Sequence, residues 1–183
     1  MRYGCPYRII KFDEQSLNLV WRCIASTDLQ WEDSIVVDKH QDRNPRSSEV
    51  AWINNDYLDN LLLRYVQHIN VECKWNLKIT GVEPVQFGSY PEGGFYNWHV
   101  DQHSMPEKVV RKISMSLFLN EDYEGGEFDL ELYRPGTDQR YETFKLPTGS
   151  AIFFQGDQWH RVRPVTSGLR KSLVAWFYGP PYV

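Results

Sequence analysis

The chain has 183 residues, a formal net charge of −4 and a hydrophobic content of 42%. This length fits one domain, residues 1–183, that can bury a substantial core. Seven tryptophans and an aromatic content of 15% exclude a low-complexity or disordered chain. Nucleic-acid binding depends on Lys and Arg neutralising phosphates, so the acidic balance leads us to expect no nucleic-acid partner.

The cysteines and the hydropathy pattern indicate the compartment. Cys5, Cys23 and Cys73 are odd in number and widely spaced, which favours neither a disulfide framework nor a thiolate zinc site. The N-terminus has no apolar stretch of signal-peptide length, and nowhere do about eighteen apolar residues run together. We therefore expect a cytoplasmic protein with no membrane partner; the sequence leaves its oligomeric state open.

Residues 1–75 are predicted to form a flank of helices and short strands. Apolar residues at Leu17, Val20 and Ile24 have the spacing of an amphipathic helix, and Asp13 is placed to cap it. A clearer apolar stripe predicts a second helix, preceded by the capping candidates Asn54, Asn55 and Asp56. Its members are Leu58, Leu61, Leu62, Tyr65, Val66 and Ile69. Residues 34–38 and 48–53 are predicted to be short strands.

After Trp75 the pattern changes to short β-rich runs separated by turn residues. The predicted strands are residues 78–80, 84–90, 94–100, 112–119, 128–133, 140–146, 151–154, 160–165 and 171–178. Many short strands at such spacing are typical of a sandwich or barrel. We predict a mainly β (α+β) fold, a double-stranded β-helix or jelly roll over residues 76–180, with the two N-terminal helices packed on one sheet.

The pair His99 and Asp101 is the first candidate site. In an extended strand, residues two apart project from the same face, so an imidazole and a carboxylate lie side by side. A third ligand from a distant strand completes the two-histidine, one-carboxylate set of non-heme Fe(II) oxygenases, and His160 is the natural candidate. His-x-Asp alone is weak evidence, because such pairs occur by chance.

Three segments together resemble a known family. They are Tyr-Pro-Glu-Gly-Gly-Phe-Tyr-Asn-Trp-His-Val-Asp at 90–101, Leu-Asn through Tyr-Glu-Gly-Gly-Glu-Phe at 119–128, and Trp-His through Pro-Val-Thr-Ser-Gly-Leu-Arg at 159–170. In this order they resemble the prolyl 4-hydroxylase-like branch of the Fe(II)/2-oxoglutarate-dependent dioxygenases, over roughly residues 80–180.

The resemblance implies a role for each matching residue. His99, Asp101 and His160 would be the iron ligands and catalytic centre, and Arg170 would bind the far carboxylate of 2-oxoglutarate, with Ser172 beside it. A guanidinium binds a carboxylate in bidentate fashion better than an ammonium does, which favours Arg170 over Lys171. Strand parity also places Arg170, Ser172, Val174 and Trp176 on one face.

Further residues match positions near the cosubstrate in the family. The Tyr90 hydroxyl would add a hydrogen bond to the buried carboxylate, although a core tyrosine explains it equally well. Phe118 stands where some relatives carry a tyrosine, and Val162 and Trp176 match pocket walls or ordinary core. His103 is expected on a loop at the site mouth, and His40 and His68 are expected to be structural or exposed.

The resemblance also implies the reaction. Fe(II), 2-oxoglutarate and O2, with ascorbate as a reductant, would hydroxylate a C–H bond and release succinate and CO2. A carboxylate ligand at Asp101 favours hydroxylation over halogenation. The leading substrate is a prolyl residue of a peptide or protein, and the alternative is a free amino acid or other small molecule. Competing hypotheses are nucleobase dealkylation, a Zn or Mn cupin, which would not need Arg170, and a non-catalytic jelly-roll binding module.

Overall fold

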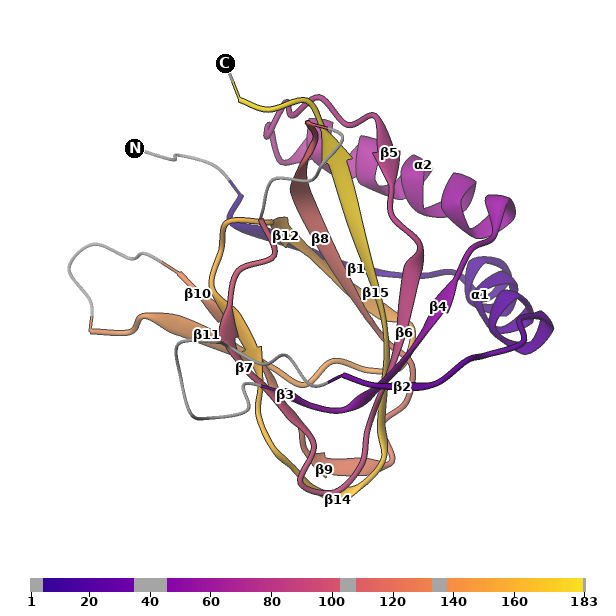
Figure 1. Ribbon diagram of the computed structural model, residues 1–183. Coiled ribbons are helices and arrows are strands. Elements are labelled where there is room, and N and C mark those ends of the chain that lie inside the picture. Colours follow the sequence, from indigo (N-terminus) through magenta and orange to yellow (C-terminus); the bar gives the residue numbers. More distant parts are fainter. Residues whose placement is uncertain (1–4, 35–45, 103–107, 133–137, 183) are drawn as a thin grey trace.

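The protein has two main antiparallel sheets and a short two-stranded one, with two helices against the largest sheet (Figure 1). A computed structural model describes residues 5–34, 46–102, 108–132 and 138–182. The mainly β prediction with two flanking helices is confirmed. None of the helices in the described ranges has the length and apolar character needed to cross a membrane.

The larger sheet, called the major sheet, forms the centre of the molecule. Its hydrogen-bonded order is β1-β12-β8-β15-β6-β4-β2, with β5 paired to β15. The strands are β1 (Tyr7–Lys11), β12 (Ser150–Gln155), β8 (Val110–Phe118), β15 (Arg170–Gly179), β6 (Val85–Tyr90), β4 (Glu49–Ile53), β2 (Glu32–Asp33) and β5 (Gly81–Val82). Strands β8 and β15 lie side by side in its middle.

The smaller sheet, called the minor sheet, faces one side of the major sheet. Its order is β11-β10-β13-β7-β3, and a separate pair, β14-β9, closes one end (Figure 1). The strands are β11 (Tyr141–Phe144), β10 (Phe128–Glu131), β13 (His160–Val162), β7 (Phe95–His99), β3 (Arg46–Ser47), β14 (Val165–Gly168) and β9 (Tyr123–Gly125).

Both helices begin at the expected caps. α1 (Glu14–Ser26) follows Asp13, whose carboxylate accepts a hydrogen bond from the Ser16 N–H at 2.7 Å. α2 (Asp56–Glu72) follows Asn55, whose side-chain oxygen accepts from two backbone N–H groups of the first turn. These contacts satisfy N–H groups that a helix start leaves without partners. The apolar faces of both helices bury against the major sheet.

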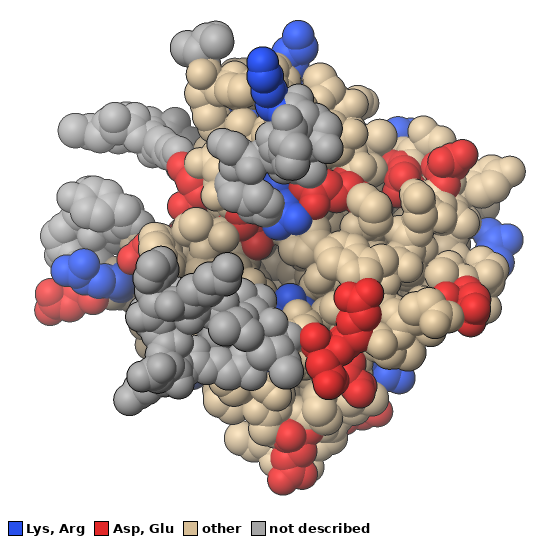
Figure 2. All heavy atoms as spheres, viewed as in Figure 1, with Lys and Arg blue, Asp and Glu red and all other residues tan. Residues whose placement is uncertain are grey.

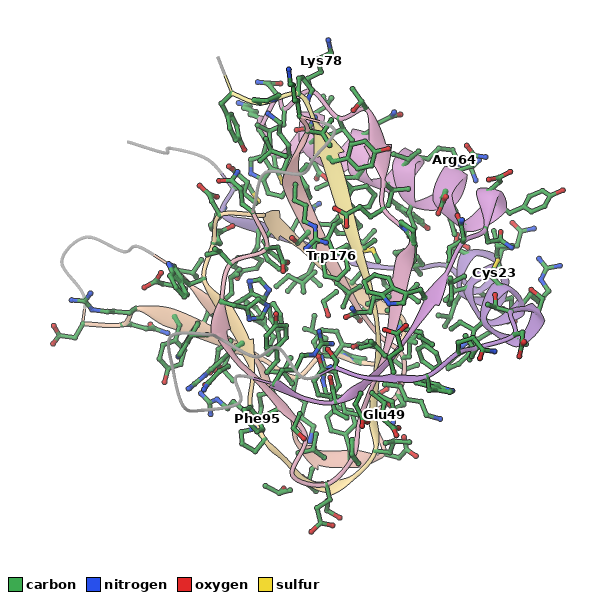
Figure 3. All side chains as sticks on the ribbon, in the orientation of Figure 1. Cys23, Glu49, Arg64, Lys78, Phe95 and Trp176 are labelled. Carbon is green, nitrogen blue, oxygen red and sulfur yellow. The ribbon has the colours of Figure 1, made fainter. Side chains whose placement is uncertain are left out.

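Residues of β15 alternate between two interiors, as strand parity predicts. Leu173, Ala175 and Phe177 pack in the core against the helices. Arg170 and Trp176 lie on the opposite face, between the two sheets, where Figure 3 labels Trp176. Strand β8 divides in the same way, and its Ile113, Met115, Leu117 side belongs to the helix-side core. A single pair of strands therefore serves both interiors.

Some predicted boundaries are wrong. Residues 78–80 are not a strand, because ladder pairing with β15 begins only at Gly81. The run 160–165 is two strands, since Pro164 has no N–H for a continuous ladder. β1 and β9 were not expected; β1 pairs with β12, about 140 residues away in sequence, so no local pattern marks it. Most of the predicted strand 34–38 lies outside the described residues.

Surface charge is mixed on the face seen in Figure 2. Lys and Arg side chains there stand singly among Asp and Glu, and they do not gather into one basic patch. This observation concerns one face and the described residues alone.

Candidate active site

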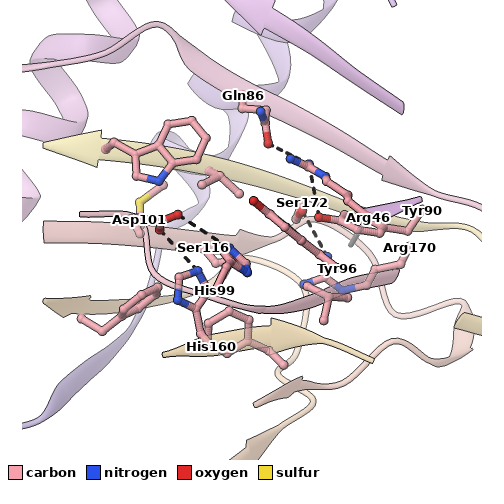
Figure 4. A pocket seen from close by; sticks show the side chains of 16 residues that line it. Arg46, Gln86, Tyr90, Tyr96, His99, Asp101, Ser116, His160, Arg170 and Ser172 are labelled. Carbon is pink, nitrogen blue, oxygen red and sulfur yellow. Dashed lines mark hydrogen bonds and ion pairs between the residues drawn. The ribbon is translucent and has the colours of Figure 1, made fainter. Parts of the chain in front are cut away.

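The His-x-Asp pair and the distant histidine meet between the two sheets. His99 ends β7, and His160 begins β13, where the two residues pair across the ladder. One ligand-type atom from each of His99, Asp101 and His160 lies within 4.8 Å of the others. Asp101 and His160 are each 5% exposed. All three line one pocket together with Arg170 (Figure 4).

Both imidazoles are oriented by backbone carbonyls. Nδ1 of His99 lies 2.7 Å from the Asn97 carbonyl oxygen, and Nδ1 of His160 lies 3.0 Å from that of Gln158. Because a carbonyl only accepts, each Nδ1 carries the proton and each Nε2 keeps its lone pair. The Nε2 atoms face the Asp101 carboxylate at 3.7 Å and 3.3 Å. Both rings thus present a coordinating nitrogen to the same point.

The protonation states suit a cation site. Burial, assisted by the neighbouring His160, lowers the pKa of His99 to about 3, so this ring is neutral at neutral pH. For Asp101, burial alone raises the pKa, but His160 and a 2.7 Å hydrogen bond from the Ser114 hydroxyl outweigh it and hold the pKa below its usual range. A neutral imidazole and a carboxylate are the forms that bind metal.

Arg170 lies at another part of the pocket and is 1% exposed. Its Nη1 donates to the Ser172 hydroxyl at 3.1 Å, and its Cζ lies 5.2 Å from the ring centres of both Tyr90 and Phe118. Its Nε and Nη2 have no hydrogen-bond partner among the described residues. Buried guanidinium N–H groups without acceptors are costly, so this pair of donors fits a bound carboxylate.

The other predicted site residues lie around this arginine. Tyr90, Ser172, Val162 and Trp176 all line the pocket, whereas Phe118 packs behind the guanidinium and does not. His68 is exposed on α2. His40 and His103 lie outside the described residues.

A second buried arginine, Arg46, was not identified from the sequence. It is 5% exposed on β3, and it lines the same pocket. Its Nη2 donates to the side-chain oxygen of Gln86 at 2.9 Å and to the Tyr90 hydroxyl at 3.4 Å (Figure 4). Arg46 therefore joins two residues of β6 to the minor sheet.

Arg46 also begins a stack that reaches a candidate ligand. Its Cζ lies 4.5 Å from the Tyr96 ring centre, and the Tyr96 ring is stacked on His99 at 3.5 Å and 14°. Burial raises the pKa of Tyr96 to about 12, so the phenol stays neutral. No pattern in the sequence near Arg46 marks this role. It depends on the pairing of β3 with β7, which is known only once the sheet is known.

The donor set fits the group that the sequence resemblance implies. Two imidazole nitrogens and one carboxylate form the set typical of non-heme Fe(II) oxygenases, and the same pocket holds a buried arginine with two donors that have no partner among the described residues. The pocket has roughly 400 Å³ of empty space, a volume that includes its opening to solvent.

Comparison with known proteins assigns the family. The family model of the 2OG-Fe(II) oxygenase superfamily matches residues 85–178, more than half of the chain. The chain belongs to this superfamily. A PKHD-type hydroxylase from a Synechococcus species is 33% identical over 100 residues, which cover 52% of this chain and 42% of the relative. The chain thus matches less than half the length of this curated relative.

Solved structures share the fold. A Pseudomonas putida prolyl-4-hydroxylase has a TM-score of 0.67 at 22% identity, over 94% of this chain and 91% of that one. A prolyl hydroxylase from Trichoplax adhaerens, in complex with a hypoxia inducible factor peptide fragment, has a TM-score of 0.60 at 16% identity, over 94% and 83%. These likenesses confirm the predicted double-stranded β-helix.

Proposed function

We propose that the protein is an Fe(II)- and 2-oxoglutarate-dependent hydroxylase. The observation that carries this proposal is that one pocket holds both the His99, Asp101, His160 cluster and a buried arginine, Arg170, with two donors that have no partner among the described residues. A jelly-roll binding module would need neither feature. A Zn or Mn cupin would need the cluster alone, so Arg170 favours the oxygenase.

In this proposal, Nε2 of each histidine and the Asp101 carboxylate hold Fe(II). The Asn97 and Gln158 carbonyls keep both rings in the tautomer that leaves Nε2 free. The Ser114 hydroxyl orients the carboxylate by its 2.7 Å hydrogen bond. One anionic and two neutral ligands leave coordination positions open for other groups.

Arg170 would hold the far carboxylate of 2-oxoglutarate. Its Nε and Nη2 are the free edge of the guanidinium, while Nη1 is fixed by Ser172. The rings of Tyr90 and Phe118 stack against it and restrict its movement. Tyr90, which is also joined to Arg46, would add a hydrogen bond from its hydroxyl.

When bound, iron and 2-oxoglutarate supply the oxidising chemistry that converts a C–H bond to C–OH with O2, yielding succinate and CO2. The chain orients the reactants and excludes water, since Phe128, Phe154 and Val162 form apolar walls of the pocket. Ascorbate as a reductant stays a prediction. In this proposal residues 1–183 form a single dioxygenase domain, because β1 and β4 of the N-terminal flank pair with β12 and β6.

The proposed substrate is a prolyl residue of a peptide or protein. The names of the structural neighbours support this choice, and one of them holds a peptide. A free amino acid or other small molecule is the second candidate, because the chain is similar to only part of its curated relatives.

Two measurements test the proposal. Anaerobic addition of Fe(II) and 2-oxoglutarate should produce a weak visible absorption band, and air should then allow succinate release with a gain of one oxygen in a substrate. Blocked proline peptides and free amino acids are assayed in parallel to identify the substrate class. A folded chain that gives neither band nor succinate contradicts the proposal and favours a non-catalytic module.

A further inference from the structure

Asp101 lies just beyond the strand that carries His99. β7 ends at His99, so Asp101 belongs to the segment that follows the strand. The Ser114 hydroxyl orients its carboxylate. Its backbone N–H donates to the Gly156 carbonyl oxygen at 3.0 Å, and the next N–H, that of Gln102, donates to the same oxygen at 2.8 Å. A carbonyl oxygen has two lone pairs, so one oxygen holds the backbone that directs Asp101 into the pocket.

Gly156 connects this segment to a second candidate ligand. It lies in the turn between β12 and β13, two residues before Gln158, whose carbonyl orients the His160 ring. Its N–H donates to the Lys112 carbonyl oxygen of β8 at 3.0 Å. A Cβ at this position would lie 3.1 Å from the Arg111 carbonyl oxygen, so glycine lets the turn lie this close to β8. One short turn therefore supports two of the three candidate ligands.

Tyr182, three residues after the end of β15, contacts both sides of this support. Its hydroxyl accepts a hydrogen bond from Nε2 of Gln102 at 3.1 Å, and Nζ of Lys112 lies 3.6 Å from its ring centre. Lys112 is 3% exposed, so its ammonium gains from the face of the ring. With the two bonds of Gly156, these contacts close a circuit of four residues from four segments of the chain.

This circuit restrains the position of the carboxylate. A segment outside the ladder depends on a small number of hydrogen bonds, so each bond restricts its movement. Contacts behind the ligands of a metal orient those ligands before the ion binds. The bond from Gln102 to Tyr182 is a contact of this kind, because Gln102 is the residue next to Asp101 and shares its acceptor on Gly156.

We propose that Tyr182 is a positioning residue for the metal site. It holds Gln102, and through Gln102 the Asp101 carboxylate, in place for the ion. This inference rests on the proposed function and deepens it, because Tyr182 lies outside the residues that line the pocket. β15 then serves the site at both ends: Arg170 begins the strand, and the segment after it supports the carboxylate ligand.

The first test adds Co(II) to the metal-free chain without 2-oxoglutarate, because the visible absorption of Co(II) depends on its coordination geometry. Tyr182→Phe keeps the ring beside Lys112 and removes the hydroxyl. The dissociation constant of Co(II) should rise about twofold to tenfold, the effect of one hydrogen bond, and the visible band should change. Tyr57→Phe removes a hydroxyl from a residue of α2 that is 76% exposed, and it should leave both properties unchanged.

A double-variant cycle assigns the loss to the bond between the two side chains. Gln102→Met keeps a similar length and cannot donate, so alone it should weaken Co(II) binding as much as Tyr182→Phe does. The combination should weaken binding little further, because both substitutions remove the same bond. Gln102→Met also measures this bond if Tyr182→Phe does not fold.

Hydrogen exchange of the metal-free chain gives a readout that needs no ion. The Asp101 and Gln102 N–H groups, which donate to Gly156, should exchange with deuterium faster in Tyr182→Phe than in the wild type. The amides of α2 are the internal reference and should exchange at the wild-type rate.

Three results overturn the inference. The first is a folded Tyr182→Phe protein with the Co(II) affinity and spectrum of the wild type; a lower unfolding temperature alone would make Tyr182 a structural residue. The second is additive losses in the double variant, and the third is unchanged exchange at Asp101 and Gln102. Each can occur while the wild-type chain forms succinate with Fe(II) and 2-oxoglutarate, so failure of this inference is distinguishable from failure of the proposed function.

Discussion

Two buried interiors lie on opposite sides of the major sheet, and they differ in chemistry. The helix side is packed with apolar residues such as Ile113, Leu117 and Leu173, each 0% exposed. The side between the sheets buries charged residues just as deeply, Arg170 at 1% and Asp101 at 5%. β8 and β15 supply both interiors by alternation. Stability and ligand binding are therefore divided between neighbouring residues of the same strands.

The largest expected effect comes from the carboxylate between the sheets. Asp101→Ala removes the one acidic side chain that lines the described pocket, so iron-dependent succinate formation should be abolished. Asp122→Ala, an exposed carboxylate outside the pocket, is the control and should keep full turnover. Undiminished succinate release by the Asp101 variant would remove this residue from the site.

A substitution on the helix side should affect stability instead. Leu173→Ala leaves a cavity in the core, and a buried leucine truncation costs about 2–5 kcal/mol of unfolding free energy. Urea denaturation measures this loss. The KM for 2-oxoglutarate of the remaining folded enzyme should match the wild type, since Leu173 faces away from the pocket. A changed KM with little loss of stability would break the division between the two faces.

Arg170 and Lys171 are adjacent in sequence and project from opposite faces of β15, so a substitution at each compares the two faces. Arg170→Ala removes charge-assisted hydrogen bonds worth about 1.5–3 kcal/mol, so 2-oxoglutarate should bind roughly tenfold to a hundredfold more weakly. Lys171→Ala, on the other face, should change nothing. Anaerobic titration of the visible band gives both affinities. If the lysine variant is the weaker binder, the carboxylate partner has been assigned to the wrong residue.

The sequence predicts most of this division, because alternation along a strand is a local property. The parity of β8 and β15, the two helices and their caps follow from residues close in the chain. His99 and Asp101 are two residues apart, so their shared direction is also local. Joining them to His160 and Arg170 required motifs in a fixed order, because ladder contacts across sixty residues leave no local pattern.

Arg46 shows where such prediction ends. Its role depends on β3 pairing with β7, on Gln86 and Tyr90 of β6, and on the Tyr96 ring. None of these residues is near it in sequence. Because Arg46 is a polar residue that follows Asn44-Pro45, the local sequence predicts a turn. Only tertiary contacts bury Arg46. The boundaries of β5 and the existence of β1 were likewise set by distant strands.

Arg46 offers a smaller effect on the same side of the sheet. Arg46→Met keeps the length of the side chain and removes the stacking of the guanidinium on Tyr96, an interaction worth about 0.5–2 kcal/mol. Because Tyr96 stacks on His99, Fe(II) should bind severalfold more weakly, and Arg46→Lys should restore part of this affinity. If Arg46→Met lowers the free energy of unfolding by this amount but leaves the Fe(II) affinity unchanged, Arg46 has a structural role only.

The smallest effect concerns a polar group on the helix side. Asp59 of α2 has a buried Oδ1 without a partner among the described residues, and burial, with the nearby Asp56, raises its pKa from 3.8 to about 6. Between these values the folded state binds more protons than the unfolded state. The contribution of Asp59 to stability is therefore present at low pH and is lost as pH rises through about 4 to 6.

Asp59→Asn should abolish this dependence, because the amide does not titrate. Thermal unfolding across pH 4 to 7.5 compares the two proteins, and other titrating groups contribute equally to both. The variant should gain stability relative to the wild type as pH rises through about 4 to 6 and keep that gain at higher pH, by a small amount since Asp59 is partly exposed. If the unfolding temperatures of the two proteins change in parallel with pH, ionisation of the Asp59 carboxylate does not destabilise the folded state. The helix side would then tolerate a charge at this position, and the contrast between the two interiors would rest on the apolar residues of β8 and β15 alone.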